Sequence, residues 1–268
     1  MDYVIIGGDG RLAHLARLLK GRDASVGTIF REPVPGVPDL GTEALSTAKI
    51  AVVNCPPRLA GSDMAFEELL AALPEGARVF TCGPRHPDFD PRVTDLFADE
   101  ELLVENAALT AEGAIAAAMN ASEIAIAELH SLVIGWGRIG RALTERLVAL
   151  GTKVTVASRS EAGRNRAVER GAEAVPTGEI GRALPGHDLV FNTAPGLVLD
   201  GDALERSDQN AMLIDLASPP YGIDLAAAWA LGRRAWREPA LPGRYCPGSA
   251  ARAILRALDR AERRVRHD

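Results

Sequence analysis

The strongest pattern of hydrophobic and polar positions lies in residues 129–160. An unbroken apolar run at residues 132–134 leads into a glycine-rich stretch, and a second apolar run follows at residues 154–156. Between the two runs, apolar residues recur at helical spacing: Ile139, Leu143, Leu147 and Leu150. A short apolar run, a turn, an amphipathic stretch and a second run predict a strand, a helix and another strand, which together form a βαβ unit.

Weaker patterns of the same kind fill the rest of the chain. Further strands are expected at residues 3–6, 25–29, 50–53, 78–81, 102–105, 174–175, 188–192, 211–216 and 233–236. Helices are expected at residues 12–19, 63–73, 110–129 (with Thr110 as N-cap), 163–170 and 249–266. The proline-rich residues 238–248 are expected to form a loop. Strands separated by helices are typical of parallel sheets.

The predicted fold class is α/β, with two Rossmann-like parallel-sheet domains flanking a cleft. Residues 1–129 are expected to form a flavodoxin-like domain that carries substrate and catalytic residues and ends in the connecting helix. Residues 130–247 are expected to form a Rossmann domain. Residues 248–268 are expected to form a helix that packs back on the N-terminal domain.

The glycines of the central turn have the GxGxxG spacing of dinucleotide-binding sites. Gly135 allows a sharp turn, Gly137 allows backbone N–H groups to approach a pyrophosphate, and Gly140 allows the helix to pack closely on the strand. The positive end of the helix then faces the phosphates. A turn that binds no ligand is the alternative. The residues predicted to bind the cofactor here are Gly135, Trp136, Gly137, Arg138, Ile139 and Gly140.

The end of the second strand indicates which dinucleotide is bound. NAD-selective sites usually place a carboxylate there for the ribose 2′-OH, whereas this chain has Ser158, Arg159 and Ser160. A guanidinium and two hydroxyls bind a 2′-phosphate through charge-assisted hydrogen bonds. We therefore predict NADP rather than NAD. The alternative is that Arg159 is a solvated charge at the start of a helix.

In this fold, ligands bind outside the carboxyl ends of the parallel strands. The nicotinamide is therefore expected near two short segments: Asn192, Thr193, Ala194 and Pro195, and Asp215, Leu216 and Ala217. The alternative is that Asn192 and Thr193 close a turn and that Asp215 caps a neighbouring helix.

Composition excludes several classes of protein. A chain of 268 residues, 47% apolar, is long enough for two domains, and its net charge of −6 argues against nucleic-acid binding. No apolar run approaches the roughly 20 residues needed to cross a bilayer, so we expect a cytoplasmic protein. The cysteines, Cys55, Cys82 and Cys246, lack CxxC spacing, so neither a disulfide framework nor a metal site is expected.

Five separated motifs resemble the family of the dipicolinate synthase A subunit, and the resemblance runs from residue 4 to about residue 255. They are Ile-Gly-Gly-Asp-Gly-Arg at residues 6–11, Thr-Ala-Glu-Gly at 110–113, the glycine turn at 135–140, Ile-Asp-Leu-Ala-Ser at 214–218 with Gly-Ile-Asp at 222–224, and Leu-Pro-Gly at 241–243. The resemblance implies oxidation of dihydrodipicolinate to dipicolinate with NADP⁺ during sporulation, with the flavoprotein-like B subunit of dipicolinate synthase as partner. The family tends to carry Pro-Lys-Thr after the last motif, where this chain has Pro247, Gly248 and Ser249.

This chemistry needs groups that bind carboxylates and a base that removes a ring proton. Arg11, Arg85 and Ser218 are the candidates for substrate binding, although an arginine is more often a surface charge. Glu112, His86 and Asp224 are the candidate bases. Glu112 is expected in the first turn of its helix, where the helix dipole stabilises an acid whether or not it is catalytic.

Two other functions remain open. One is an NADP-dependent 2-hydroxy or amino acid dehydrogenase, and the other is a nucleotide-binding subunit without its own catalysis. We also expect the protein to form a homo-oligomer.

Overall fold

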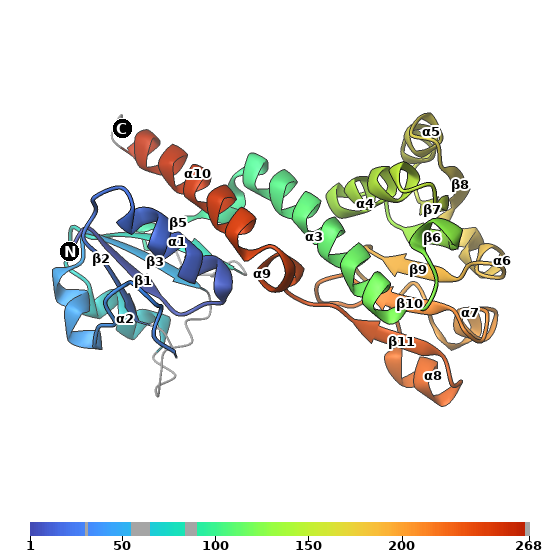
Figure 1. The fold of residues 1–268 in the computed structure, drawn as a ribbon, viewed down its shortest axis with the longest axis horizontal. Coiled ribbons are helices and arrows are strands. Elements are labelled where there is room, and N and C mark those ends of the chain that lie inside the picture. The colour runs from blue at the N-terminus through green and yellow to red at the C-terminus, as the bar shows by residue number, and fades with distance from the viewer. Residues whose placement is uncertain (30–31, 55–64, 84–89, 266–268) are drawn as a thin grey trace. The chain divides into compact units, whose positions relative to one another are not determined.

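Two parallel β-sheets, each with its own helices, make up the fold (Figure 1). The computed structural model describes residues 1–29, 32–54, 65–83 and 90–265. The first compact unit comprises Met1–Asn106 and Pro242–Asp268, and the second comprises Ala107–Leu241. The prediction of two Rossmann-like parallel-sheet domains is confirmed.

The first unit contains a five-stranded sheet in the order β2-β1-β3-β4-β5. All of its neighbouring strands pair in parallel. This is the flavodoxin-like order that the sequence predicts. The strands are β1 (Tyr3–Ile6), β2 (Val26–Ile29), β3 (Ile50–Asn54), β4 (Arg78–Cys82) and β5 (Val93–Asp95).

Successive residues of these strands point to opposite faces of the sheet, and each face is apolar. Ile5 packs with buried residues of α1 (Gly10–Lys20) and of the C-terminal helix α10 (Pro247–Val265), and α1 and α10 pack against each other. Val4 and Ile6 pack on the other face with α2 (Phe66–Ala72). The last helix of the chain therefore completes the core of the first unit.

The predicted strand at residues 102–105 is wrong, because these residues belong to the helix α3 (Glu100–Ala121). The Asp99 carboxylate accepts a hydrogen bond from Leu102 N at 2.9 Å, and two glutamates occupy the first turn, both of which favour a helix start. Thr110, predicted as the N-cap, is a buried residue in the interior of this helix. The fifth strand of the sheet is instead β5.

The second unit contains a six-stranded sheet in the order β11-β10-β9-β6-β7-β8, and all its neighbouring strands pair in parallel. This is the strand order of dinucleotide-binding Rossmann folds. The strands are β6 (His130–Ile134), β7 (Lys153–Ser158), β8 (Glu173–Pro176), β9 (Leu189–Asn192), β10 (Met212–Asp215) and β11 (Arg234–Arg237).

Helices cover both faces of this sheet (Figure 1). They are α4 (Arg138–Ala149), α5 (Glu161–Glu169), α6 (Ile180–Ala183), α7 (Gly201–Glu205) and α8 (Leu225–Ala230). Short 3-10 helices occur in the two units at Thr42–Thr47, Leu96–Ala98, Ile126–Glu128 and Thr177–Glu179. Residues from β6, β9 and β10 form one apolar core with residues of α6, α7 and α8.

The loop predicted at residues 238–248 is largely helical. It contains α9 (Leu241–Tyr245), and α10 begins at Pro247. Proline lacks an N–H group, but the first turn of a helix leaves its N–H groups unpaired within the helix, so Pro242 and Pro247 are compatible with helix starts. The boundaries between the units follow residues 106 and 241, so most of α3 belongs to the second unit. The boundaries predicted from the sequence follow residues 129 and 247.

By length and composition alone, α3 meets the criterion for a helix that could cross a membrane. Core helices meet the same criterion. Several residues of α3 are buried in the fold, among them Leu102, Ala111, Ala114 and Ala118.

Candidate dinucleotide site

A pocket of about 410 Å³ lies at the carboxyl ends of the strands in the second sheet. It includes residues from each of the segments that were predicted to surround the cofactor, except the segment after β10. The pocket also includes three residues that were not predicted from the sequence: Ile134, Thr177 and Val198. The lining residues are Ile134, Gly135, Trp136, Gly137, Ser158, Arg159, Ser160, Thr177, Thr193, Ala194, Pro195 and Val198.

Two of the three fingerprint glycines are required by packing within the protein. Gly135 has a φ of +105°, and a Cβ there would lie 2.6 Å from Thr193 Oγ1. A Cβ on Gly140 would clash with the carbonyl oxygen of Gly135. These positions explain the sharp turn and the close contact between helix and strand.

Gly137 differs from the other two glycines, because a Cβ there would meet no described atom within 4 Å. Its φ of −78° is also open to any residue. The lack of a side chain therefore leaves open space beside the start of α4, where a Cβ would obstruct a phosphate group. This cradle fits a dinucleotide diphosphate.

The start of α4 is favourable for an anion. Gly137 is the N-cap and provides no side-chain hydrogen bond to the helix. The first backbone N–H groups of a helix have no partners inside it and carry a partial positive charge. Arg138, Ile139 and Gly140 belong to this first turn but do not line the pocket.

The opposite end of the pocket is formed by the turn after β7. Arg164 Nη1 donates to the carbonyl oxygens of Ser158 at 3.0 Å and Arg159 at 3.1 Å, so its guanidinium stabilises the turn. The Ser160 hydroxyl accepts a hydrogen bond from Gly163 N and caps α5. Arg159 is exposed, and no carboxylate lines this pocket among the residues that the structure describes.

Trp136 and the two serines converge on the first turn of α5. A Cβ on Gly163 would lie 2.6 Å from Ser158 Oγ, 2.8 Å from Ser160 Oγ and 3.2 Å from Trp136 Cδ1, so a side chain at this position would displace the two serine hydroxyls. The indole nitrogen of Trp136 is buried and has no hydrogen-bond partner within the described part of the chain. Buried donors are usually paired, so a bound ligand could supply the missing acceptor.

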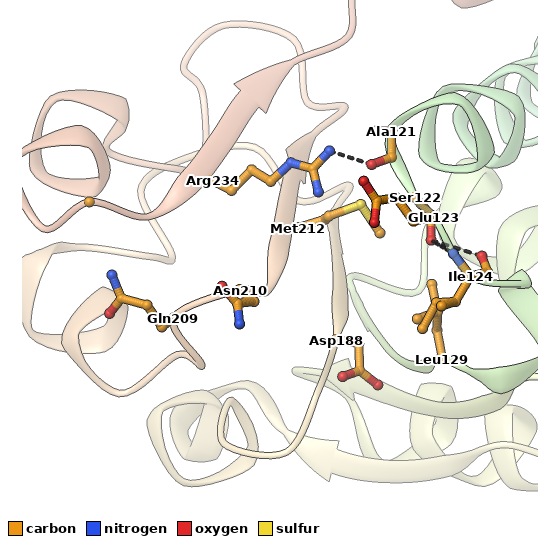
Figure 2. A pocket seen from close by; sticks show the side chains of 11 residues that line it. Ala121, Ser122, Glu123, Ile124, Leu129, Asp188, Gln209, Asn210, Met212 and Arg234 are labelled. Carbon is orange, nitrogen blue, oxygen red and sulfur yellow. Dashed lines mark hydrogen bonds between the residues drawn. The ribbon is translucent and has the colours of Figure 1, made fainter.

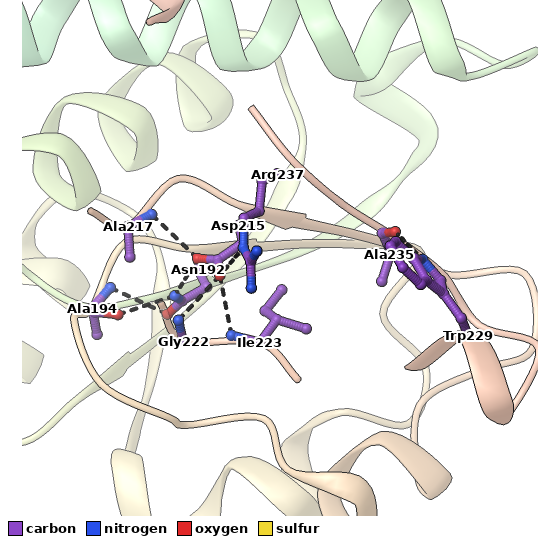
Figure 3. A network of polar contacts seen from close by, with 9 residues as sticks. All are labelled: Asn192, Ala194, Asp215, Ala217, Gly222, Ile223, Trp229, Ala235 and Arg237. Carbon is purple, nitrogen blue, oxygen red and sulfur yellow. Dashed lines mark hydrogen bonds and ion pairs between the residues drawn. The ribbon is translucent and has the colours of Figure 1, made fainter. Parts of the chain in front are cut away.

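Asn192 and Asp215 form a buried network beside the pocket (Figure 3). The Asn192 side chain donates to Asp215 Oδ1 at 2.8 Å and to the carbonyl of Ala194, whose N–H donates back to Asn192 Oδ1. Asp215 also accepts hydrogen bonds from the backbone N–H groups of Ala217, Gly222 and Ile223 at 3.0–3.2 Å. Neither side chain lines the pocket, so they position its loops.

The other residues predicted at the nicotinamide end fall into two groups. Thr193, Ala194 and Pro195 line the pocket, and Thr193 Oγ1 donates to the carbonyl of Ile134 at 2.9 Å. Leu216 and Ala217 do not line it.

The candidate bases are distributed across the fold. Glu112 lies in the middle of α3, not in a first turn, and its exposed carboxylate pairs with Arg146 at 3.1 Å. Asp224 is the N-cap of α8 and accepts a hydrogen bond from Ala227 N at 3.0 Å. His86, like the predicted substrate residue Arg85, lies outside the described residues.

The other two predicted substrate residues occupy different units. Ser218 is exposed on the loop after β10. Arg11, at the start of α1, donates through Nε to the Asp9 carboxylate at 2.9 Å. The Asp9 carboxylate faces Gly243, where a Cβ would lie 2.8 Å from Asp9 Cγ. Two of the five family-like motifs, at residues 6–11 and 241–243, therefore meet in the first unit.

A second pocket, of about 690 Å³, lies at the amino ends of the strands in the second sheet (Figure 2). Several of its polar groups are paired within the fold. Arg234 donates to the carbonyl of Ala121, and Asp188 accepts a hydrogen bond from His130 N at 2.9 Å. We assign no function to this pocket, because it lies at the amino ends of the strands, whereas the nucleotide fingerprint lies at their carboxyl ends.

Comparisons with known proteins agree with this geometry. Residues 132–219 match the protein family described as "NADP oxidoreductase coenzyme F420-dependent". The match lies within the second unit and supports an oxidoreductase that uses a pyridine nucleotide.

The sequence is 30% identical to the dipicolinate synthase A subunit of Bacillus subtilis (strain 168) over 169 residues, which is 63% of this chain and 57% of that protein. The crystal structure of the dipicolinate synthase A subunit from Bacillus halodurans superposes with a TM-score of 0.83, covering 97% of each chain at 25% identity. The chain resembles the A subunit of dipicolinate synthase. The sequence match spans less than two thirds of the Bacillus subtilis protein.

The fold is also shared with D-lactate dehydrogenase from Escherichia coli. That structure has a TM-score of 0.60 and covers 98% of this chain and 97% of its own, at 14% identity. The superposition establishes a common fold, but at an identity this low it gives no information about a common substrate.

Proposed function

We propose that this protein is an NADP-dependent oxidoreductase that converts dihydrodipicolinate into dipicolinate, pyridine-2,6-dicarboxylate. The observation that carries the cofactor assignment is the open cradle at Gly137, in a pocket whose far end presents the exposed Arg159 and no described carboxylate. The likeness to the dipicolinate synthase A subunit supports the substrate.

The preference for NADP rests on the turn after β7. A carboxylate at this place would repel a 2′-phosphate, whereas the guanidinium of Arg159 attracts it. Ser158 and Ser160 add hydroxyls, and Arg164 holds the backbone of the turn through two carbonyls.

The reaction removes a hydride from one ring atom and a proton from another, which leaves an aromatic ring. When bound, the oxidised nicotinamide accepts the hydride. We assign the residues after β9 to the nicotinamide, with the Asn192 and Asp215 side chains holding those residues in place.

A base must accept the ring proton. We retain Glu112 and His86 as candidates, since the Asp224 carboxylate already caps α8. Glu112 would have to leave Arg146 in order to reach a substrate, and its exposed position allows this.

Substrate binding requires cations for the two carboxylates. We assign Arg11 to this role, because its pairing with Asp9 through Nε fixes the direction of the guanidinium. Arg85 and Ser218 are further candidates.

We propose that the protein works in the cytoplasm during sporulation. A second, different subunit is the expected partner, because the relative's name designates one subunit of an enzyme. We also expect a homo-oligomer.

Two measurements test the proposal. Fluorescence titration should give tighter binding of NADPH than of NADH. The purified chain should also form NADPH from freshly generated dihydrodipicolinate, with or without the partner subunit. Tighter binding of NADH would contradict the cofactor assignment, and binding without any turnover would favour a non-catalytic nucleotide-binding subunit.

A further inference from the structure

Arg237, the last residue of β11, carries a guanidinium that makes no hydrogen bond to the described part of the protein. Its side chain is 38% exposed. Its Cζ lies 3.8 Å from the centre of the Tyr221 ring. Its Nε lies 4.0 Å from Asp215 Oδ2 (Figure 3). Both contacts orient the group, but neither occupies its N–H donors.

Asp215 does not use these donors because its carboxylate is already saturated. Four shorter hydrogen bonds reach it, from the Asn192 side chain and from three backbone N–H groups, at 2.8–3.2 Å. The negative charge of Asp215 therefore attracts Arg237 without binding it closely. The guanidinium is therefore oriented, and its N–H donors can bind another anion.

The position of Arg237 follows from the register of the sheet. One row of paired residues crosses the sheet at the carboxyl ends of its strands. It runs through Ala157, Ile134, Asn192, Asp215 and Arg237 in that order. The dinucleotide pocket lies over the part of this row that includes Ile134. Neighbouring strands are about 4.8 Å apart, so Arg237 is roughly 10 Å beyond Asn192.

We propose that Arg237, backed by the Tyr221 ring, binds a carboxylate group of the substrate beside the nicotinamide end of the site. This inference rests on the proposed function, which puts the adenosine at β7 and the nicotinamide after β9. A planar guanidinium can hold a carboxylate through two parallel hydrogen bonds. Tyr221, which is also exposed, keeps the plane of the guanidinium fixed.

The test compares Arg237→Gln with Arg234→Gln, a matched change on the same strand. Arg234 also lies over an aromatic ring, at 5.8 Å from the centre of Trp236, but it occupies the other end of β11. Binding of pyridine-2,6-dicarboxylate to the NADP⁺-loaded protein is measured by calorimetry, together with the affinity for NADP⁺ alone.

Arg237→Gln should weaken dicarboxylate binding by about 10- to 100-fold, in the range expected for hydrogen bonds to a charged group. NADP⁺ affinity should change by less than about twofold, since the buried hydrogen bonds of Asp215 do not include Arg237. Arg237→Lys should restore part of the binding, because the charge returns without the planar pair of donors. Arg234→Gln should bind the dicarboxylate like the parent.

Three results would overturn the inference: parental dicarboxylate affinity in Arg237→Gln, an equal loss of NADP⁺ affinity in that variant, or no dicarboxylate binding by the parent protein. The proposed function fails separately if the parent binds the dicarboxylate through Arg237 yet does not oxidise dihydrodipicolinate. Full turnover by Arg237→Gln with an unchanged KM would remove the inference and leave the function intact.

Discussion

In each unit, the first strand along the chain is buried and leads through a glycine turn into a helix, but the start of that helix differs between the units. In the first unit, Asp9 is the N-cap of α1, and its carboxylate accepts hydrogen bonds from the backbone N–H and Nε of Arg11. In the second unit, the N-cap of α4 is Gly137, which has no side chain. The first unit supplies its own anion, whereas the second leaves that position open.

Packing reinforces this difference. A Cβ on Gly10 would lie 3.2 Å from Pro247 Cβ, so the beginning of α10 closes over the first turn of α1. A Cβ on Gly137 would meet no described atom within 4 Å. The same order of strand, turn and helix therefore leaves room for a phosphate at the helix start only where that start is both uncapped and uncovered.

The largest effect is expected when a carboxylate is placed at the N-cap of α4, where α1 has Asp9. Gly137→Asp should weaken NADPH binding at least 100-fold, because like charges about 4 Å apart near a protein surface repel by several kcal/mol. The free energy of unfolding should change little, since the position is open. Fluorescence titration and thermal unfolding measure the two quantities.

Gly76→Asp is the matched control for that change. Gly76 also has open surroundings, but it lies in the first unit. We expect it to bind NADPH normally. Normal binding by Gly137→Asp would show that the fingerprint turn does not hold the diphosphate.

Arg159→Gln should have the next largest effect. NADPH affinity should fall by about 10- to 100-fold with NADH affinity nearly unchanged, as expected for loss of a charge-assisted contact to the 2′-phosphate. Arg166→Gln, an exposed change on α5, is the control. Equal losses for both cofactors would mean that Arg159 does not distinguish them.

A smaller effect is expected from the ion pair that ties α10 to the start of α3 within the first unit. Arg260 donates to both Asp99 carboxylate oxygens, at 2.7 and 2.9 Å, and lowers the pKa of Asp99 from 3.8 to about 2. Because the pKa of Asp99 is lower in the folded state, its ion pair with Arg260 stabilises the folded protein above about pH 4. This stabilisation is lost as the pH falls towards 2.

Asp99→Asn should therefore reduce the free energy of unfolding by roughly 1–2 kcal/mol at pH 7, while keeping the hydrogen bond that caps α3. Urea unfolding at several pH values measures this. The difference from the parent protein should shrink between pH 4 and pH 2. A difference that is constant over that interval would exclude this ion pair as its source.

The smallest effect is expected from Asp9→Ala. Loss of the α1 cap should reduce the free energy of unfolding by about 1 kcal/mol. NADPH affinity should stay within about twofold of the parent, because the cap belongs to the unit without the fingerprint. Asp200→Ala, which removes the cap of α7, should cause a similar loss of stability. A large loss of NADPH affinity in Asp9→Ala would contradict the separation of roles.

The dinucleotide fingerprint was predictable because its information is local. Glycine spacing, the apolar run before it and the helical period after it all lie within about 30 residues, which is the length of a βαβ unit. The assignment of residues 102–105 failed for the opposite reason. A short apolar run fits a strand or a helix equally well, and the Asp99 cap and the packing of α3 decide between them.

The roles of Asn192 and Asp215 were also beyond local reasoning. Both polar residues end apolar strands, which is equally compatible with a ligand contact and with a structural hydrogen bond. Their mutual hydrogen bond joins residues 23 positions apart. Arg237 gave no sequence signal, because it resembles any arginine at the end of an edge strand.

By itself, the sequence determined the strand and helix periods, the order of elements that makes both sheets parallel, and the glycine turn that fits a dinucleotide. Only the tertiary structure decided that residues 102–105 belong to α3, that four donors saturate the Asp215 carboxylate, and that the N–H donors of Arg237 make no hydrogen bond within the described residues. Short-range periodicity encodes secondary structure, whereas the pairing of a polar group depends on which distant residues the fold brings within about 3 Å of it.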